Sequence, residues 1–374
     1  MRREFLSGNR AIAEAAILSG LKFYAGYPIT PASDLMEYLA EKLPSYGGIV
    51  VQFEDEIASI NAAIGASWAG VKAMTATSGP GFSLMAEGVS LAVATETPVV
   101  VVDIMRAGPS TGIPTKATQS DVYQARWLAH GDYTIPVFAP WSVQDCYDMT
   151  IKSFNVAEKF RTPVVLLSDA NIAHMWETLY VREPGEVEII ERKKPSVPPE
   201  EYRPYQPGLD LVPPMAVFGE GYKVIVESLV HDELGYYRQD SVTYREMIAR
   251  LNEKIRRGVG YIYEQEEYWV EDSDAVVVAY GSTARMVYPV VKALREKGAR
   301  VGFLRLKTLW PLDEERLWRA LSRAGKVIVV ENNTGRVYLD VARIAGSART
   351  FFSPVLTVDP PKFSEVMEAV AKWL

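Results

Sequence analysis

The sequence predicts an α/β protein with two doubly wound parallel-sheet domains joined by a proline-rich arm. Short apolar runs alternate with helix-length segments over residues 1–185, and the same alternation returns over 271–374. Such alternation is typical of parallel sheets covered by helices on both faces. The connector between the domains, residues 186–270, begins with the arm (186–240), in which residues 193–214 hold seven prolines and show no periodicity.

In the first domain, helices are expected where small or apolar residues recur at helical spacing, and strands where short apolar runs stand between them. The expected order is helix 7–20, strand 21–27, helix 32–43, strand 48–54, helix 55–70, strand 71–78, helix 82–95, strand 97–105, helix 141–160 and strand 162–169.

The tyrosines of the arm favour a segment that packs against the rest of the chain. One amphipathic helix, 241–258, completes the connector. The second domain is then predicted as strand 274–282, helix 283–298, strand and turn 299–312, helix 313–325, strand 326–333, helix 335–346, strand 353–359 and helix 363–374.

Composition excludes several classes of protein. A net charge of −7 and a pI near 5.3 argue against a nucleic-acid surface. No apolar run is long enough for a membrane span and no secretory signal is visible, so a cytoplasmic chain without membrane contact is expected. The 14 Asn and Gln residues in 374 favour a thermophilic source.

Metal chemistry within this chain is not expected. Cys146 is the only cysteine, which excludes an intrachain disulfide, a cysteine zinc site and a self-contained iron–sulfur centre. The three histidines lack metal-ligand spacing, and His231, followed by Asp232 and Glu233, is expected in a solvated loop. No metal ligand is assigned, and any redox metal must belong to another chain.

Thr30 stands between two prolines in the segment GYPITPASDL, residues 26–35. As an N-cap on a helix starting at Pro31, its hydroxyl would satisfy free backbone N–H groups. Alternatively, it lies at the carboxyl end of a strand, where α/β proteins bind ligands, and Pro28 and Pro31 fix its direction. The residues alone favour the cap and leave the second interpretation open.

Glu56 is the most informative acidic residue. Glu54 and Asp55 suit a helix N-terminus, where acidic groups interact favourably with the helix dipole. Small and apolar residues follow Glu56, so its carboxyl group is expected in a buried interface. A buried carboxylate needs a partner or a raised pKa.

Two further segments follow predicted strands. The turn 77–81, with two glycines and a proline, suits a close approach of backbone to a flat or anionic ligand, although any tight turn has this composition. Arg106 leads from an apolar strand into a run of Gly, Pro, Ser and Thr. It suits bidentate capture of a carboxylate, with a structural salt bridge as the equal alternative. Lys116 adds a second cation.

Together these segments resemble the α subunit of 2-oxoacid:ferredoxin oxidoreductases, enzymes that use thiamine diphosphate. GYPITPAS resembles the signature loop of that family, EDEIASINAAIGAS its cofactor-glutamate helix, TATSGPGFSLM its pyrimidine-pocket turn and RAGPSTGIPT its substrate loop. The likeness covers nearly the whole chain, and RAGPSTGIPTKATQSD is more similar to the 2-oxoglutarate branch than to the pyruvate branch.

The resemblance implies a pyrimidine-binding domain over 1–185 and a transketolase C-terminal-like domain over 271–374. It implies that Glu56 hydrogen-bonds the pyrimidine ring, that Arg106 holds the substrate carboxylate and that Thr30 lies at the reacting centre. The implied cofactor neighbours are Pro28, Ile29, Gly81 and Phe82, and the implied substrate neighbours are Ser110, Thr111, Thr115 and Lys116.

The resemblance also implies partners. Thiamine diphosphate would be shared with a β subunit that brings Mg²⁺ and an iron–sulfur cluster, and some members have a γ subunit as well. Coenzyme A would accept the acyl group, and ferredoxin would accept the electrons. The absence of a Gly-Asp-Gly motif and of a cysteine cluster in this chain agrees with that division. Two alternatives stay open: a subunit of a non-oxidative thiamine diphosphate enzyme, and a scaffold subunit with a vestigial pocket.

Overall fold

The computed structural model describes residues 2–374, and its main body is a seven-stranded sheet in the order β12-β6-β7-β5-β4-β2-β3. All of these strands run parallel except β12, which pairs antiparallel with β6. The parallel strands are β2 (Leu21–Gly26), β3 (Ile49–Gln52), β4 (Lys72–Thr77), β5 (Val99–Met105), β6 (Val137–Phe138) and β7 (Pro163–Asp169).

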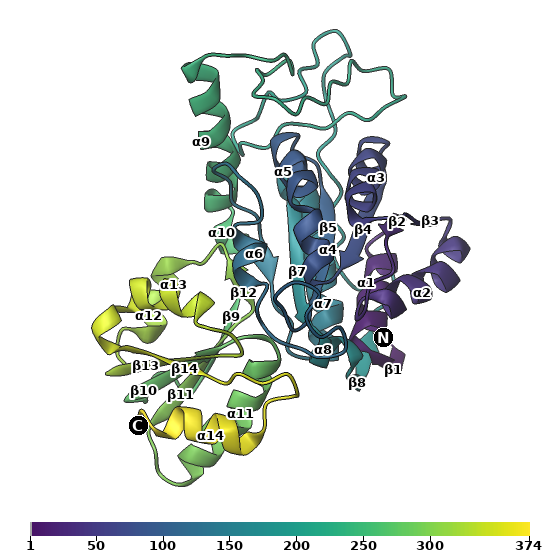
Figure 1. Cartoon of the computed structure of the whole chain (residues 1–374). Coiled ribbons are helices and arrows are strands. Elements are labelled where there is room, and N and C mark those ends of the chain that lie inside the picture. The colour runs from purple at the N-terminus through teal and green to yellow at the C-terminus, as the bar shows by residue number, and fades with distance from the viewer. Residues whose placement is uncertain (1) are drawn as a thin grey trace.

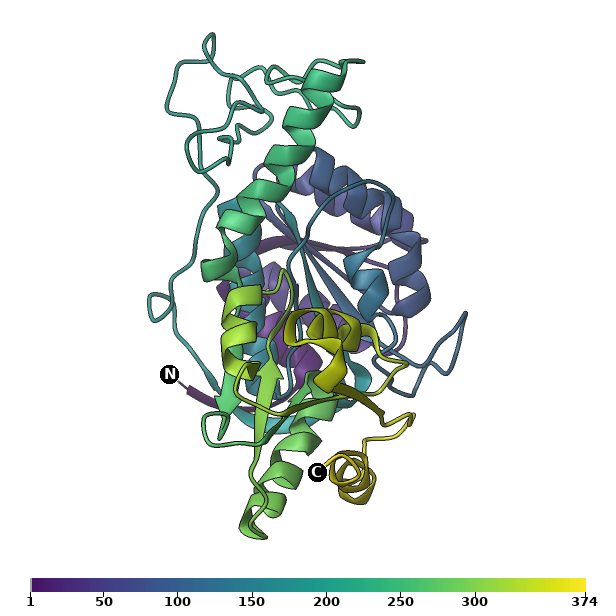
Figure 2. The same ribbon diagram turned by 90° about the vertical axis from the view of Figure 1, so that its left-hand side faces the viewer.

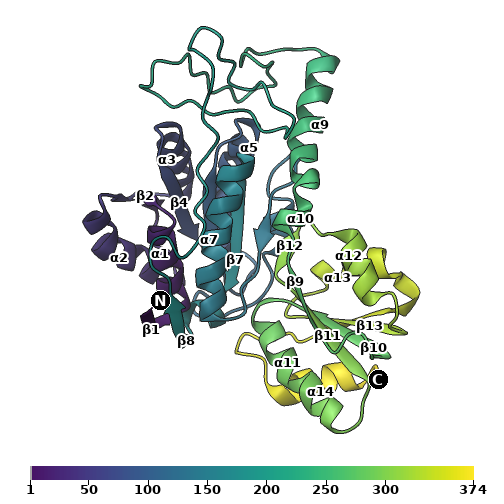
Figure 3. The ribbon, with the colours of Figure 1, turned by 180° about the vertical axis from the view of Figure 1, so that it is seen from behind.

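Helices cover both faces of this sheet (Figures 1 and 3). Successive side chains of the fully buried strand β5 point to opposite faces of the sheet. Val99 and Val101 pack with α3 and α5, whereas Val100 and Val102 pack with α1 and α7. The helices are α1 (Gly8–Leu18), α2 (Ser33–Lys42), α3 (Glu56–Trp68), α4 (Gly79–Leu84), α5 (Ala86–Ala94), α6 (Val122–Arg126), α7 (Val143–Phe160) and α8 (Ala170–His174).

The second sheet has the order β14-β13-β10-β11-β9 and is parallel except for β9. Its strands are β9 (Gln265–Tyr268), β10 (Ala275–Ala279), β11 (Val301–Leu306), β13 (Lys326–Glu331) and β14 (Thr350–Pro354). Its helices are α11 (Gly281–Glu296), α12 (Glu314–Leu321), α13 (Arg336–Ala345) and α14 (Phe363–Ala371). The predicted fold class, with two doubly wound sheets, is confirmed.

Several elements differ from the sequence prediction. The segment 82–95 forms two helices that meet at Met85, because Pro80 lies in the first turn of α4 and starts that helix earlier. The last strand is Thr350–Pro354 rather than 353–359. Two strands, β1 (Arg2–Ser7) and β8 (Trp176–Val181), form an unpredicted antiparallel pair. The unpredicted β12 (Thr308–Trp310) lies on the edge of the first sheet, although the flanking segments belong to the second.

The arm runs without helix or regular strand beside the first domain and leads into α9 (Ser241–Arg257) and α10 (Val259–Ile262) (Figure 2). It is packed, as expected from its tyrosines: Tyr202 and Tyr205 are buried. Arg192 is buried too and holds Glu158 of α7 through two hydrogen bonds of 2.8 Å. The expectation of a solvated His231 is wrong, because its ring is buried against Tyr205 at 4.0 Å between centroids.

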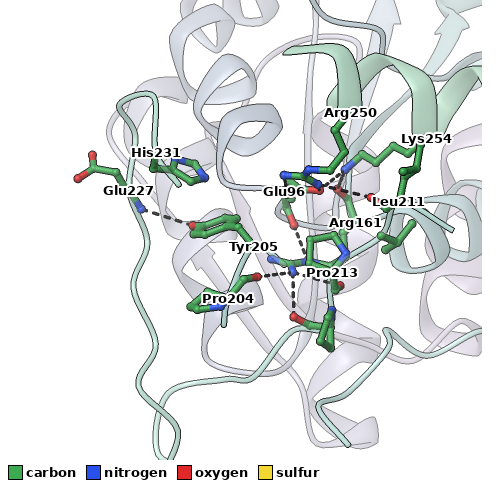
Figure 4. Close-up of polar contacts among 12 residues, drawn as sticks. Glu96, Arg161, Pro204, Tyr205, Leu211, Pro213, Glu227, His231, Arg250 and Lys254 are labelled. Atoms are coloured by element: carbon green, nitrogen blue, oxygen red, sulfur yellow. Dashed lines mark hydrogen bonds and ion pairs between the residues drawn. The ribbon is translucent and has the colours of Figure 1, made fainter. Parts of the chain in front are cut away.

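A buried ionic group, here called the Glu96 cluster (Glu96, Arg161, Arg250 and Lys254), joins α9 and the arm to the first domain (Figure 4). The carboxylate of Glu96 is fully buried and accepts bonds from Arg250 at 2.6 and 2.8 Å and from Lys254 at 2.7 Å. Arg161 donates to the carbonyls of Glu96, Pro204, Pro213 and Pro214. The arm is therefore fixed by charged groups in the protein interior.

Candidate functional site

Four loops meet at one edge of the first sheet. They follow the neighbouring strands β5, β4, β2 and β3, and because these strands are parallel their carboxyl ends share one edge. Arg106 follows β5, Gly81 follows β4, Thr30 follows β2 and Glu56 follows β3. The fold thus brings the predicted central residues together from distant parts of the sequence.

Glu56 is the first residue of α3, whose N-cap is Asp55, with its carboxylate accepting from the Ala58 N–H at 2.7 Å. Glu56 itself is only 4% exposed. A Cβ added to Gly81 would lie 2.2 Å from Glu56 Oε1 and 2.2 Å from Thr77 Oγ1. The carboxyl group therefore lies directly against the turn after β4, and that position has room only for glycine.

The surroundings of Glu56 favour the protonated form of its carboxyl group. Burial raises the pKa of its carboxyl group; its own backbone N–H and Arg106 oppose this shift only in part. Among residues 2–374, no other side chain hydrogen-bonds this carboxyl group, and the buried Thr77 hydroxyl has no partner. A proton-sharing acid with an open oxygen is thus available to a ligand.

Arg106 is 5% exposed and holds two loops. One terminal nitrogen donates to the Thr30 carbonyl at 2.8 Å, the other to the Thr111 carbonyl at 3.0 Å, and the buried Nε has no partner. Among the described residues, Arg106 therefore forms no salt bridge, so that alternative is wrong. The guanidinium keeps N–H groups that these two carbonyls do not use.

Thr30 does not cap a helix. Helix α2 begins at Ser33, and its N-cap residue is Ala32, so the predicted start at Pro31 is wrong. Residues 29–32 form a tight turn instead, with the Ala32 N–H donating to the Ile29 carbonyl at 2.8 Å. The side chain of Asn9 in α1 donates to the Pro31 carbonyl at 2.9 Å and so holds this turn in place. Thr30 itself is exposed.

The other predicted residues lie in different surroundings. Ser110, Thr111 and Thr115 are exposed on the loop after Arg106, and Pro28 and Ile29 lie in the turn before Thr30. The ring of Phe82 is fully buried in the main core, so its side chain faces away from solvent. Lys116 forms an ion pair with Asp359 of the second domain.

A cleft of about 1070 Å³ opens beside Arg106. Ser110 and Asp121 line it from the first domain, and Asn332, Asn333 and Arg336 from the second. Gln119 joins the two sides, since its amide donates to the Tyr280 carbonyl at 3.0 Å and accepts from Thr283 at 2.8 Å. Sequence reasoning missed the second side, although Asn332 and Asn333 directly follow strand β13.

Comparison with known proteins shows the family of this chain. Residues 14–250 match the family model described as pyruvate flavodoxin/ferredoxin oxidoreductase, thiamine diP-bdg, and residues 273–358 match pyruvate:ferredoxin oxidoreductase core domain II. The 2-oxoglutarate synthase subunit KorA of Methanothermobacter thermautotrophicus is 44% identical over 370 residues, 98% of both chains. The chain belongs to the 2-oxoacid:ferredoxin oxidoreductase family.

Solved structures place the fold in the same family. A 2-oxoglutarate:ferredoxin oxidoreductase from Magnetococcus marinus, solved with 2-oxoglutarate, coenzyme A and succinyl-CoA bound, superimposes with a TM-score of 0.94 at 35% identity. The match covers 99% of this chain and 65% of that longer one. A split-gene transketolase shares the fold with a TM-score of 0.56 at 14% identity, over 98% of this chain and 96% of its own.

The residues present fit the aminopyrimidine part of thiamine diphosphate, the cofactor of this family. A nitrogen heterocycle needs a proton-sharing acid, a backbone surface without side chains and polar neighbours. Glu56, Gly81 and the unpartnered Thr77 hydroxyl supply these in one place. Within the described residues, no group of His, Cys, Asp and Glu could hold a metal, and no helix is long and apolar enough to cross a bilayer.

Replacing Gly81 with alanine is expected to destabilise the isolated chain by about 1–3 kcal/mol, because the new Cβ would overlap Glu56 and Thr77. Denaturant unfolding measures this loss. Gly65→Ala is the matched control: Gly65 lies in α3 with nothing within 4 Å of its added Cβ, and alanine there stabilises a helix by about 0.5–1 kcal/mol. Equal behaviour of the two variants would contradict the described contact.

Proposed function

We propose that this chain is the pyrimidine-binding α subunit of an enzyme that oxidatively decarboxylates a 2-oxoacid, with 2-oxoglutarate favoured. The products would be acyl-CoA and CO₂, with ferredoxin reduced. One observation carries this proposal: the buried carboxyl group of Glu56 lies against Gly81 at the sheet edge that also holds Arg106. The relatives named 2-oxoglutarate synthase support the choice of substrate.

In this proposal Glu56 shares a proton with a pyrimidine ring nitrogen, and Pro28, Ile29, Gly81 and the backbone at Phe82 shape the cofactor pocket. Bound thiamine diphosphate supplies the electron sink that a 2-oxoacid needs in order to lose CO₂. Arg106 holds the substrate carboxylate with its free N–H groups, and Thr30 offers a hydroxyl beside it. The remaining proposed substrate neighbours are Ser110, Thr111, Thr115 and Lys116, the last after release of Asp359.

The chain is proposed to work only in an assembly. It has one cysteine and no Gly-Asp-Gly motif, so a β subunit would supply the diphosphate and Mg²⁺ site and the iron–sulfur cluster, with a γ subunit in some assemblies. We also propose a cytoplasmic location and domain bounds of 1–185, 186–270 and 271–374.

The test is co-expression with a cysteine-rich β chain and an assay over several 2-oxoacids, with coenzyme A and ferredoxin or a viologen dye. Activity of the complex, highest with 2-oxoglutarate and absent from the chain alone, is the expected result. An active complex without iron would favour the non-oxidative alternative. Full activity of complexes carrying Glu56→Ala and Arg106→Ala would favour a scaffold subunit.

Replacing Arg106 with lysine in that complex is expected to raise KM for the 2-oxoacid on the order of 10–100-fold. One ammonium cannot hold the Thr30 and Thr111 carbonyls and a carboxylate together, and a charged hydrogen bond is worth about 1.5–3 kcal/mol. Steady-state kinetics measure the effect. Arg203→Lys, on a half-exposed arm residue, should leave KM unchanged. An unchanged KM for the Arg106 variant would remove this residue from the substrate site.

A further inference from the structure

Two buried aspartates at the base of the substrate loop have no role in the function proposed above. Asp103 lies within strand β5 and is fully buried, and Asp121, directly before α6, is 9% exposed. Both carboxyl groups lie against Gly79, close enough to each other to share a proton: a Cβ added to Gly79 would lie 3.6 Å from Asp121 Oδ2. Asp103 Oδ1 accepts from the Gly79 N–H at 3.1 Å, whereas the buried Oδ2 atoms of both residues have no donor among the described residues.

A hydrogen bond between two carboxyl groups requires a proton on one of them, because ionised carboxylates only accept. The geometry assigns this proton to Asp103, whose Oδ1 already accepts from Gly79 and whose Oδ2 is left to donate. Burial and the neighbouring charge of Asp121 raise the pKa of Asp103 well above its usual range. Burial raises the pKa of Asp121 as well, but there the hydrogen bond from Asp103 and the charge of Arg106 oppose the rise, so Asp121 is the partner that carries the charge.

The aspartate pair closes the loop that holds Arg106. Asp103 precedes the loop and Asp121 follows it, so their bond ties the two ends of residues 106–120 together. Through Gly79 the same bond reaches the turn that contains Gly81. The charged side chain facing both aspartates is Arg106, which also acts on Glu56, and α4 contributes only the Gly79 N–H.

We propose that the proton shared by Asp103 and Asp121 keeps the substrate loop closed and preserves the attraction of Arg106 for an anionic substrate. With one proton, the single charge of the pair balances that of Arg106. Loss of the proton would give the loop base a net negative charge and place two ionised carboxylates in contact, which repel each other and the substrate. Both aspartates are thus positioning residues. This positioning role rests on the function proposed for Arg106, whereas the existence of the protonated aspartate pair does not.

The kinetic test uses Asp103→Asn in the assembled enzyme. The amide oxygen can accept from Gly79 and the amide nitrogen can donate to Asp121, so the variant imitates the protonated pair at every pH. In the parent enzyme, KM for the 2-oxoacid should rise on the order of tenfold at alkaline pH, the size of one pKa unit of interaction, with a smaller change in kcat. In the variant that rise should be absent. Asp132→Asn, in an exposed loop, is the matched control and should keep it.

Infrared spectroscopy of the isolated chain tests the pair without any activity. The difference between the spectra of the parent and of Asp103→Asn isolates the carbonyl stretch of a protonated Asp103. This band should be present at neutral pH and fade at alkaline pH, and Asp132→Asn should leave it unchanged. A missing band overturns the pair. If the band is present but KM of the Asp103→Asn enzyme still rises at alkaline pH, the positioning role is overturned. A band in a chain whose complex never turns over a 2-oxoacid overturns the proposed function and, with it, the positioning role, while the pair stands.

Discussion

Replacing Glu56 with glutamine in the assembled enzyme is expected to lower kcat by about 10²–10⁴-fold, the usual contribution of an acid–base group. Glutamine keeps the size of the side chain beside Gly81 but cannot exchange a proton with a ring nitrogen. The assay is steady-state turnover with cofactor and substrate at saturation. Glu54→Gln, two residues away and exposed, is the control and should retain turnover. A Glu56 variant within twofold of the parent would exclude the proposed role.

The same variant should be at least as stable as the parent at neutral pH. The pKa of Glu56 is raised in the folded chain, so the folded state binds more protons than the unfolded state above the ordinary pKa of 4.5. Stability from this group is therefore lost as the pH rises through that window, and glutamine does not suffer that loss. Thermal unfolding of the isolated chain across this pH range measures the difference. A strongly destabilised variant would instead indicate a structural carboxylate.

Replacing Glu96 with glutamine is expected to cost about 3–5 kcal/mol of unfolding free energy, because Arg250 and Lys254 would remain buried without a counter-charge. Burial alone raises the pKa of Glu96, but the charges of Arg250 and Lys254 outweigh it and hold the pKa below its usual range. The stabilisation is therefore present above pH 4.5 and lost on acidification. Denaturant unfolding at neutral and acidic pH should show the difference between parent and variant shrinking as the pH falls.

Hydrogen exchange should locate the damage of this substitution in the arm and α9, the segments that the Glu96 cluster holds. Glu315→Gln is the control, because Glu315 pairs with Arg319 on the surface, where an ion pair contributes about 0–1 kcal/mol. A Glu96 variant no less stable than this control would show that the arm is held by its tyrosines and Arg192 instead.

Local patterning was sufficient for most of the longer strands and helices of both sheets, but not for the short strands β6, β9 and β12. An all-apolar run such as that of β5 has few alternatives to a buried parallel strand. The pairing of β1 with β8 was not predictable in this way, since Arg2 and Val181 meet only in the folded chain. The Thr30 cap failed because a residue before proline signals a boundary without saying whether a turn or a helix follows.

The site shows the same limit. Position at a strand end was enough to select Glu56, Gly81 and Arg106, since parallel strands bring their carboxyl ends to one edge. Asp103 was overlooked because one aspartate in an apolar strand gives no sign of its partner, Asp121, eighteen positions later. Glu96 has a φ of 50°, a conformation usually left to glycine, and Arg250 and Lys254, which bind its carboxylate, lie more than 150 residues further along the chain.

Strand β12 limits how the enzyme can admit its substrates. Because Thr308–Trp310 adds to the edge of the first sheet through β6, swinging the two lobes apart would break backbone pairing as well as the bonds of Gln119. A clamshell opening of this chain would therefore cost these hydrogen bonds. In the proposed function, the substrate would reach Arg106 through the cleft that already opens beside it, past the exposed loop 108–115, without a change in the angle between the lobes.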